Sequence, residues 1–391
     1  MIALALNAGS SSLKASLFQM DQPAEDGSTP PRPIWEREQK ADESVGDLVA
    51  SLFAGDAPVV SGPDAIDVVG HRIVHGGSAL VESVRVSPNV RADIERAAEH
   101  APEHNARALQ VLDDVARLLG PDMTQVAVFD TAFHVTLPPA AFTYAGPHEW
   151  LERGIRRFGF HGISHRYAAH RAAHLLKRDV AALRVVTCHL GGGCSLAAVR
   201  NGKSIDTTMG FTPLDGVPMG RRSGAVDPGI LIHLLRHEGQ TADSLDRLLN
   251  HESGLAGLSG TSGDMREVLA AMDAGDTRAR LAFDVYVHHI RQSVAAMAVS
   301  MNGLDALVFT GGVGEHAPRV RAAVCEGLGL LGVQLDWAAN ERVSGDADCT
   351  ASWAKVAVLV VRAEENWVVA QECARVLEAS PAPMLLRRPA G

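Results

Sequence analysis

The sequence predicts a mixed α/β protein built from two related halves, and three observations lead to this prediction. A short phrase occurs twice, as GSSSLKA at 9–15 and as GGCSLAA at 192–198. Both copies follow a short apolar run, at 2–6 and at 185–188, with the composition of a buried strand. Farther along, apolar strand-like runs alternate with helical patterns, which is typical of α/β domains. An internal repeat of this kind indicates a duplicated fold.

Each copy of the phrase is predicted to form the turn of a β-hairpin. The small residues leave successive backbone N–H groups open, and the resulting concavity suits an anion. A single Gly-Ser turn is more often an ordinary hairpin, but the repeated spacing Gly-x-x-Ser-Leu-x-Ala favours phosphate binding. The sequence therefore predicts two phosphate-binding hairpins that face one cleft.

The remaining strands are predicted from apolar runs bounded by turn residues. The polar, proline-bearing stretch 21–33 after the first hairpin is expected to be an exposed loop. The strands expected after it are 66–73, 126–129, the second hairpin within 182–206, 306–309 and 356–361.

Helices are predicted where apolar residues recur every three to four positions. The expected helices are 93–119, 164–177, 280–301, one that begins near Pro318, and 365–378. The first is expected to be interrupted at Ala101 and Pro102, because proline lacks the backbone donor that a helix interior needs. A glycine-rich turn is expected at 311–315.

Length and composition are those of a globular protein of about two domains. The chain has 391 residues, of which 46% are hydrophobic and 21% charged, and its formal net charge is −10. This charge argues against broad binding to nucleic acids or acidic membranes, but it allows a small anionic ligand in a locally basic cleft. No apolar run approaches the length of a membrane span, so a membrane is not an expected partner. Because of the net negative charge, nucleic acid is not an expected partner either.

Cysteine usage and the first residues predict a cytoplasmic chain. The five cysteines are odd in number and form no CxxC pair, which fits reduced thiols better than a disulfide framework. The opening apolar run lacks a basic segment and breaks at Asn7, so it is interpreted as a core strand and not as a signal peptide.

Two arginines beside glycines are candidate ligands for an anion. Arg72 precedes a His-Gly-Gly sequence at 75–77, and Arg222 lies within Gly-Arg-Arg-Ser-Gly at 220–224. A guanidinium among small residues can grip a carboxylate or phosphate through two parallel hydrogen bonds. A surface arginine in a polar loop is the alternative, and for either site alone it is the favoured one.

A glycine loop and a histidine between glycines are further candidates. The loop at 311–315 would offer backbone N–H groups at a helix N-terminus, where phosphate binds well, but a structural turn explains it equally. His161 could donate to a developing charge, although a lone histidine is more often structural. His161 and His165 have the spacing of a metal pair, but no glutamate stands where a zinc protease needs one, so we expect no zinc site.

Carboxylates at strand ends complete the candidates. Asp130 follows the apolar run 126–129, and Glu365 follows the run 356–361. The ends of strands are where α/β proteins place their chemistry, and carboxylates there can hold Mg²⁺ or orient an arginine. A helix cap or a solvated loop acid is an equal alternative for each. Asp264 and Glu267 have the spacing of a capping box, which is a structural role.

Together these segments resemble the acetate kinase (acetokinase) family over nearly the whole chain. The resemblance is carried by the motifs at 7–14, 70–77, 129–134, 159–162, 189–191, 209–214, 257–260 and 309–315. Each motif is moderately specific, and the ordered set is very specific. The family shares a superfamily with actin, sugar kinases and heat-shock chaperone ATPases. The resemblance therefore implies duplicated actin-like (ribonuclease H-like) domains around a nucleotide cleft, one formed by 1–131 with 366–391 and the other by 132–365.

The resemblance also implies an activity, which is reversible transfer of the γ-phosphoryl group of ATP to acetate, giving acetyl phosphate and ADP. Mg²⁺ or Mn²⁺ is the implied cofactor, ATP the co-substrate, and a homodimer the implied assembly. In-line transfer spreads charge over the equatorial oxygens, so the reaction needs cations and oriented donors and no covalent enzyme intermediate.

Roles for individual residues are implied in the same way. Asn7 and Glu365 would serve the metal. Asp130 would position the reacting groups, His161 would stabilise the transition state, and Arg222 would clamp the transferring phosphoryl group. The acetate site would be formed by Arg72, Val74, Phe160 and Pro213. The nucleotide would be held by Ser12, Lys14, His189, Leu190, Gly191, Gly192, Gly193, Asp264, Met265, Arg266, Gly312, Val313, Gly314, Glu315 and His316.

Several positions depart from the family pattern. Gly192 stands where Asn is usual, which removes a side-chain donor but keeps the backbone cradle. Glu103 stands where the family has a pocket Leu, which leaves a preference for propionate or butyrate open. Both departures also leave open a nucleotide-binding module with little transfer activity, as the less favoured alternative. A sugar kinase is disfavoured because two arginines suit an anionic acceptor. The other departures are Ile163, Cys194, Arg221, His316 and Asn366.

Overall fold

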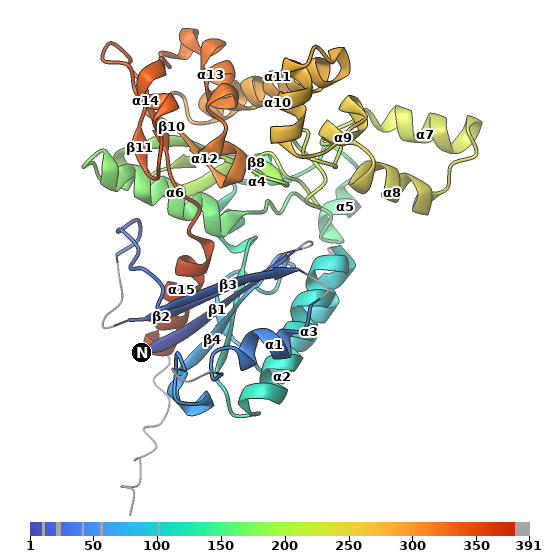
Figure 1. Ribbon diagram of the computed structural model, residues 1–391. Helices are drawn as coiled ribbons and strands as arrows, with labels where there is room; N and C mark the ends of the chain where they lie inside the picture. The colour runs from blue at the N-terminus through green and yellow to red at the C-terminus, as the bar shows by residue number, and fades with distance from the viewer. Residues whose placement is uncertain (10–11, 21–24, 41–42, 55–57, 101, 380–391) are drawn as a thin grey trace, which may run out of the picture. The chain divides into compact units, whose positions relative to one another are not determined.

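The computed structural model (Figure 1) describes residues 1–9, 12–20, 25–40, 43–54, 58–100 and 102–379, with the backbone alone at 100, 102 and 103. The chain divides into two compact units. Unit 1 consists of Met1–Ala132 with Glu364–Gly391, and unit 2 consists of Phe133–Ala363. These bounds lie one or two residues from the domains that the resemblance implies.

Unit 1 is built on a six-stranded mixed sheet with the order β3-β2-β1-β4-β6-β5. Its central strand β1 pairs antiparallel with β2 and parallel with β4, so a hairpin lies beside a parallel array. β6 continues the parallel array, and β5 closes the edge antiparallel to it. The strands are β1 (Ile2–Ala8), β2 (Ser12–Gln19), β3 (Trp35–Lys40), β4 (Val68–Ile73), β5 (Val84–Arg85) and β6 (Gln125–Phe129).

Helices cover both faces of this sheet. The helices of unit 1 are α1 (Val45–Ala50), α2 (Pro88–Ala97), α3 (Pro102–Leu119) and α15 (Glu365–Ala379). Successive residues of a strand point to opposite faces, and Val69 of β4 belongs to the core that includes residues of α1 and α3. Its neighbour Gly70 faces α15, where an added Cβ would lie 2.5 Å from both Cys373 Sγ and Val369 Cγ1. Glycine at this position therefore lets α15 lie close against β4.

Unit 2 repeats the topology of unit 1 strand for strand. Its sheet has the order β11-β12-β10-β7-β8-β9, in which β7 takes the place of β1 and β10 that of β4. The hairpin partners are again antiparallel, and β7, β10 and β12 are again parallel. The strands are β7 (Arg184–Leu190), β8 (Cys194–Arg200), β9 (Lys203–Thr207), β10 (Ala306–Thr310), β11 (Ala347–Asp348) and β12 (Ala357–Val360). The expected α/β class and the expected duplication are confirmed.

More helices surround the second sheet than the first. α6 packs against β7 and β10, and α11 packs against β8. α7 and α8 extend away from the sheet at the right of Figure 1. The helices of unit 2 are α4 (Pro139–Phe142), α5 (His148–Glu152), α6 (Gly162–Leu175), α7 (Pro228–His237), α8 (Ala242–His251), α9 (Gly254–Ser259), α10 (Met265–Asp273), α11 (Thr277–Ser300), α12 (Gly311–His316), α13 (Pro318–Glu326) and α14 (Trp337–Glu341).

The first long helix after the last parallel strand of each unit belongs to the other unit. After β6 and the short helices α4 and α5 comes α6, which packs in unit 2, and α15 follows β12 but packs against β1 and β4 of unit 1. The two helices thus have equivalent places in the repeat.

Most of the expected elements are confirmed, with ends displaced by a few residues. α11 begins three residues earlier than expected because the Asp276 side chain accepts hydrogen bonds from the backbone N–H groups of Arg278 and Ala279. The glycine-rich turn expected at 311–315 is wrong, since these residues form the short helix α12. The buried Arg321 side chain donates to the carbonyl oxygens of Gly314 and Glu315 and so satisfies the C-terminal end of this helix. In the described residues, no helix has both the length and the hydropathy that a bilayer crossing requires.

Candidate active site

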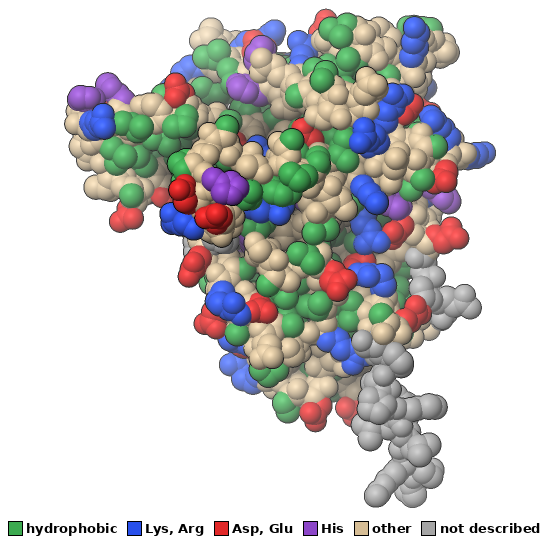
Figure 2. Space-filling view, turned by 180° about the vertical axis from the view of Figure 1, so that it is seen from behind, with side chains coloured by type: hydrophobic (Ala, Val, Ile, Leu, Met, Phe, Trp, Pro, Cys, Tyr) green, Lys and Arg blue, Asp and Glu red, His purple; other side chains and the backbone are tan. Residues whose placement is uncertain are grey.

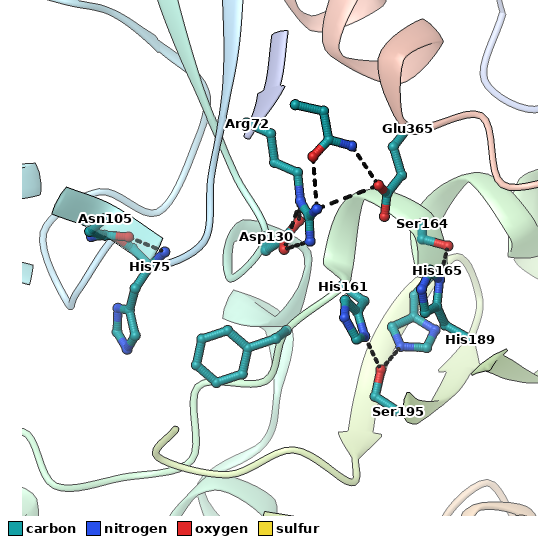
Figure 3. A network of polar contacts seen from close by, with 12 residues as sticks. Arg72, His75, Asn105, Asp130, His161, Ser164, His165, His189, Ser195 and Glu365 are labelled. Atoms are coloured by element: carbon teal, nitrogen blue, oxygen red, sulfur yellow. Dashed lines mark hydrogen bonds and ion pairs between the residues drawn. The ribbon is translucent and has the colours of Figure 1, made fainter. Parts of the chain in front are cut away.

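A buried polar cluster lies at the strand ends of unit 1, and Figure 3 shows its members around the guanidinium of Arg72. Arg72 donates from Nε and Nη2 to the Asp130 carboxylate, with an Nη2–Oδ2 distance of 2.6 Å. Its Nη1 donates to Asn7 Oδ1 at 2.9 Å and lies 3.6 Å from Glu365 Oε2. Asn7 Nδ2 donates to the same Glu365 oxygen at 2.7 Å. We call Asn7, Arg72, Asp130 and Glu365 the carboxylate cluster.

The register of the parallel strands brings this cluster together. Leu6 of β1 pairs with His71 of β4, and Arg72 of β4 pairs with Val128 of β6. Asn7, Arg72 and Asp130 therefore emerge at the same edge of the sheet. Glu365, the first residue of α15, reaches the same edge. Four residues singled out from the sequence for metal, substrate and catalysis thus meet in one place.

The charges in the cluster hold Arg72 firmly as a cation. Burial by itself would lower the pKa of Arg72, but the Asp130 and Glu365 carboxylates outweigh it and raise this pKa above its ordinary value. One guanidinium against two ionised carboxylates leaves a formal charge of −1. The Nε–Nη2 edge of Arg72 is already taken by Asp130, so an anionic ligand would have to meet the remaining N–H groups, one of which donates to Asn7.

The carboxylate cluster offers the ligands that Mg²⁺ prefers. Asn7 Oδ1 and the oxygens of Asp130 and Glu365 are hard donors, and the cluster is negative overall. Mg²⁺ in proteins is usually bound by one or two carboxylates together with substrate phosphates. In the described residues, no set of three or more His, Cys, Asp or Glu is arranged to hold a metal ion by itself. The residues present therefore fit the metal.

Two further nucleotide candidates of unit 1 lie on the β1–β2 hairpin and contact a glutamate. Ser12 Oγ donates to Glu38 Oε1 at 2.8 Å, and Lys14 Nζ lies 3.9 Å from the same oxygen. Both partners of the Lys14–Glu38 pair are more than half exposed, so the pair contributes little to stability. Ser10 and Ser11 of the turn, and the side chain of Glu103, lie outside the described residues.

In unit 2, His161, Arg222 and the start of α12 lie close to the turn of the second hairpin. A Cβ added at Gly193 would lie 3.3 Å from His161 Nε2 and 3.6 Å from Arg222 Nη2. A Cβ added at Gly191 would lie 4.0 Å from the backbone nitrogen of Gly312, at the start of α12. Glycines at these places let two side chains and the start of a helix approach the turn.

A network of histidines and hydroxyl groups lies beneath this turn. His161 Nδ1 and His165 Nε2 both hydrogen bond to Ser195 Oγ, at 2.8 and 2.7 Å (Figure 3). His165 Nδ1 hydrogen bonds to Thr187 Oγ1 at 2.7 Å. The two rings that have the spacing of a metal pair thus share a serine.

The backbone and a second imidazole also fix the place of His161. His161 caps α6 with a positive φ of 55°, a strained conformation for a side-chain-bearing residue that is enriched at functional positions. The ring of His189 stacks on the His161 ring with centroids 4.3 Å apart. Ser164 Oγ hydrogen bonds to His189 Nδ1 at 2.8 Å and holds that second ring in turn.

The expected substrate residues of unit 2 adjoin the same region. Arg222 Nη1 donates to the carbonyl oxygen of Pro213 at 3.0 Å. Phe160 is almost fully buried, and its carbonyl oxygen hydrogen bonds to His134 Nε2. Val74, the remaining member of the expected acetate pocket, is buried in unit 1.

The last two nucleotide segments are placed by helix starts. The Asp264 side chain caps α10 but accepts from the second helical N–H, that of Arg266, and not from that of Glu267, so the expected capping-box bond is wrong. The Arg266 side chain turns back onto the Asp264 carboxylate. In α12, Glu315 Oε1 accepts from the backbone N–H of Ala363, and the space beside Gly312 is open to a distance of 4 Å.

Sequence reasoning missed the supporting side chains of His161. Ser195, Thr187 and Ser164 were not candidates, and His165 was considered only as a metal ligand. One signal was available, because Ser195 is the serine that the repeated phrase keeps in both copies. Nothing in the spacing indicates that Thr187, on the neighbouring strand, reaches His165.

Comparisons with known proteins agree with this geometry. A family model described as the acetokinase family matches residues 36–371. The acetate kinase of Gloeobacter violaceus is 50% identical over 403 aligned residues, which span 95% of this chain and 98% of that protein.

Among solved structures, Porphyromonas gingivalis acetate kinase superposes with a TM-score of 0.85 at 37% identity, covering 96% of this chain and 99% of that one. A propionate kinase from Francisella tularensis has a TM-score of 0.84 at 34% identity, covering 95% of this chain and 98% of that one.

The repeated fold, its two polar clusters and these likenesses define a phosphotransferase of the α/β class. The chain belongs to the acetokinase family, as the resemblance of its motifs predicts.

Proposed function

We propose that this protein transfers the γ-phosphoryl group of ATP to acetate and forms acetyl phosphate and ADP reversibly. The observation that carries the proposal is the gathering of Asn7, Arg72, Asp130 and Glu365 into one buried cluster within a chain of the acetokinase family. An acetate oxygen would attack the γ-phosphorus in line as the bond to the ADP oxygen breaks. The enzyme then has to position the reactants and stabilise spreading negative charge.

The carboxylate cluster would bind the metal and orient Arg72. Bound Mg²⁺ would neutralise charge on the nucleotide phosphates, with Asn7 and Glu365 as its protein ligands and Asp130 nearby. Asp130 holds the guanidinium plane of Arg72 at fixed orientation, so that the remaining N–H edge can meet the carboxylate of acetate.

The second set of residues would act on the phosphoryl group. Arg222 and His161 approach the same glycine turn and would donate to the equatorial oxygens in the transition state. The main-chain groups of 189–193, of 264–266 and of α12 would hold the nucleotide, with Ser12 and Lys14 near its phosphates. Val74, Phe160 and Pro213 would enclose the acetate methyl group.

Acetate is the proposed acceptor, and propionate or butyrate is the alternative. A propionate kinase is among the similar structures, and the position of the Glu103 side chain lies outside the described residues. Rates across acetate, propionate and butyrate would separate these acceptors directly.

We also propose that the protein is a homodimer and works in the cytoplasm. Helix α7 has no buried residue and exposes Ile230, Ile232 and Leu235 by 45–51%, and Figure 2 shows hydrophobic side chains gathered on the lobe that it forms with α8. An exposed apolar face of this kind suits a second copy of the chain. The five free, buried cysteines fit a reducing compartment.

The activity is tested by phosphorus NMR of purified protein with ATP, Mg²⁺ and acetate. We expect acetyl phosphate and ADP to appear together, and Arg222→Ala to lower the rate by about a thousandfold. Arg221→Ala removes the exposed neighbouring arginine as a matched control and should leave the rate within about twofold. Absence of acetate-dependent ADP formation, or equal rates for the two variants, would contradict the proposal.

A further inference from the structure

Three hydrogen bonds in series connect the buried Thr187 to His161, and we call this series the file. Thr187 Oγ1 and His165 Nδ1 are 2.7 Å apart, His165 Nε2 and Ser195 Oγ are 2.7 Å apart, and Ser195 Oγ and His161 Nδ1 are 2.8 Å apart. Thr187, His165 and Ser195 are each fully buried. A neutral imidazole carries one proton and each hydroxyl has one to donate, so the direction of donation at one end sets it along the whole file.

The direction depends on the Thr187 end. The other acceptor for the Thr187 hydroxyl is the carbonyl oxygen of Ala197, at 3.5 Å. Hydroxyl-to-oxygen hydrogen bonds are usually 2.5–3.0 Å long, so donation to Ala197 would be weak, and we assign the Thr187 proton to the 2.7 Å contact with His165 Nδ1. With Thr187 as the donor, His165 Nδ1 is an acceptor and carries no hydrogen.

His165 must then carry its proton on Nε2. Burial, and secondarily the neighbouring His134 and His189 rings, hold the pKa of His165 well below its ordinary value, so the ring is neutral at pH 7. Its Nε2–H donates to Ser195 Oγ, and the Ser195 hydroxyl in turn donates to His161 Nδ1. A neutral His161 is thereby left with its proton on Nε2, the atom beside the Gly193 turn.

We propose that Thr187, His165 and Ser195 are positioning residues that fix His161 as the Nε2–H tautomer, so that the neutral ring donates a hydrogen bond toward the transferring phosphoryl group. The inference rests on the proposed function for its purpose, but not for its geometry. Without the file, the neutral ring could place its single proton on either nitrogen, and the Nδ1–H form would present a lone pair to an anion. A neutral donor also avoids setting a second positive charge beside the Arg222 guanidinium.

The test is nitrogen NMR of the full chain labelled with ¹⁵N-histidine, at about pH 7.5. Loss of one ring signal in His161→Gln assigns that of His161. We expect the His161 ring to show the Nε2–H tautomer. An Nδ1–H tautomer or an imidazolium in the unaltered protein would overturn the proposal, whether or not the protein phosphorylates acetate.

Variants of Thr187 separate positioning from packing. Thr187→Val keeps the shape but removes the hydroxyl, and we expect it to populate the Nδ1–H form of His161 and to lower kcat about a hundredfold, with KM for acetate and ATP within about twofold. Thr187→Ser restores the hydroxyl and should restore both the tautomer and kcat. The proposal would be overturned if Thr187→Val and Thr187→Ser gave the same tautomer and the same kcat. It would also be overturned if Thr187→Val lowered kcat without changing the tautomer of His161.

The neighbouring His134 provides a matched control. Ser204 Oγ hydrogen bonds to the buried His134 Nδ1 at 2.8 Å, outside the file. Ser204→Ala removes the same kind of hydroxyl–imidazole bond, and the tautomer of His161 should not respond to it. If Ser204→Ala changes the His161 tautomer as much as Thr187→Val does, the effect is one of general packing and the proposed role of the file is wrong.

Discussion

The two sheets have the same topology but carry different chemistry at equivalent positions. If Leu13 is superposed on Leu196, the hairpin pair Asn7–Lys14 falls on the pair Thr187–Ala197. Asn7 binds Glu365, the first residue of α15, and Thr187 binds His165 of α6. α15 and α6 have equivalent places in the repeat, so one framework holds a carboxylate contact in unit 1 and an imidazole contact in unit 2.

The neighbouring strands extend this difference. By the same superposition, Arg72 of β4 corresponds to Val308 of β10, and Asp130 corresponds to Val361. The backbone N–H of Asp130 donates to Ile73 and that of Val361 to Phe309, each at 2.9 Å, so the backbones match where the side chains do not. The comparison teaches that the same scaffold carries the charged cluster at these positions of unit 1 and the hydroxyl–histidine contacts at the equivalent positions of unit 2.

The largest effect is expected from breaking the ion pair that unit 2 lacks. Asp130→Asn leaves a buried guanidinium without its bidentate partner, so unfolding free energy should fall by about 3 kcal/mol, and kcat/KM by about a thousandfold as Arg72 loses its orientation. Guanidinium chloride titration and initial rates measure the two effects.

A surface ion pair of the same unit supplies the control. Arg91 and Asp113 form a pair with both side chains 40–55% exposed. Asp113→Asn should cost less than about 1 kcal/mol and leave the rate unchanged. Similar losses from Asp113→Asn and Asp130→Asn would refute the distinction between the buried cluster and the surface.

Acid should weaken both units through histidines that are buried in the neutral form. Burial lowers the pKa of His71 in unit 1 and of His134 in unit 2 from 6.5 to about 4. The unfolded chain takes up a proton below pH 6.5 while the folded chain does not, so stability is lost as pH falls from about 6.5 to about 4, by up to about 3 kcal/mol for each residue.

Replacing one of these histidines measures how much of the acid-induced loss of unfolding free energy it causes. In His71→Leu, the decline of unfolding free energy between about pH 7 and pH 4 should be smaller by that amount, measured by urea titration at each pH. His148, whose side chain is 80% exposed, provides the comparison, since His148→Gln should leave the decline as it is. An unaltered pH dependence in His71→Leu would count against burial as its cause.

The smallest effect concerns two adjacent glycines of the second turn. Gly193→Ala would bring a methyl group to 3.2 Å from His161 Cε1 and 3.3 Å from Nε2, so we expect kcat to fall about tenfold as the ring shifts by a few tenths of an ångström. The space beside Gly192 is open to 4 Å, and Gly192→Ala should be nearly neutral. Gly192→Asn then shows whether the side chain usual in the family matters to the rate. If alanine at 192 harms kcat as much as at 193, contact with His161 is not the reason.

Patterns local in sequence predicted the α/β class, the duplication, most strands and the longest helices. Of the carboxylate cluster, Asp130 and Glu365 were found as carboxylates after apolar strands and Arg72 as an arginine beside glycines. Asn7 was found only through the family resemblance. The hydrogen bonds of the cluster were not predictable, because Asn7 and Glu365 are 358 residues apart and meet only through the packing of α15.

The helices between 228 and 260 were missed as well. For α7 the reason is that an apolar sequence lies exposed and shows no buried stripe. The Thr187–His165 hydrogen bond was missed because it forms only through the packing of α6 against β7.

The Mg²⁺ dependence of acetate phosphorylation, compared in Glu365→Gln and His161→Asn at fixed ATP, tests the division of labour between the units most directly. We predict that Glu365→Gln raises the Mg²⁺ concentration for half-maximal rate at least about tenfold, because it removes the carboxylate proposed to bind the metal. His161→Asn should lower kcat at an unchanged Mg²⁺ requirement, because the proposed role of its ring is to act on the phosphoryl group. The same Mg²⁺ requirement in both variants, or a larger shift in His161→Asn, would contradict the account.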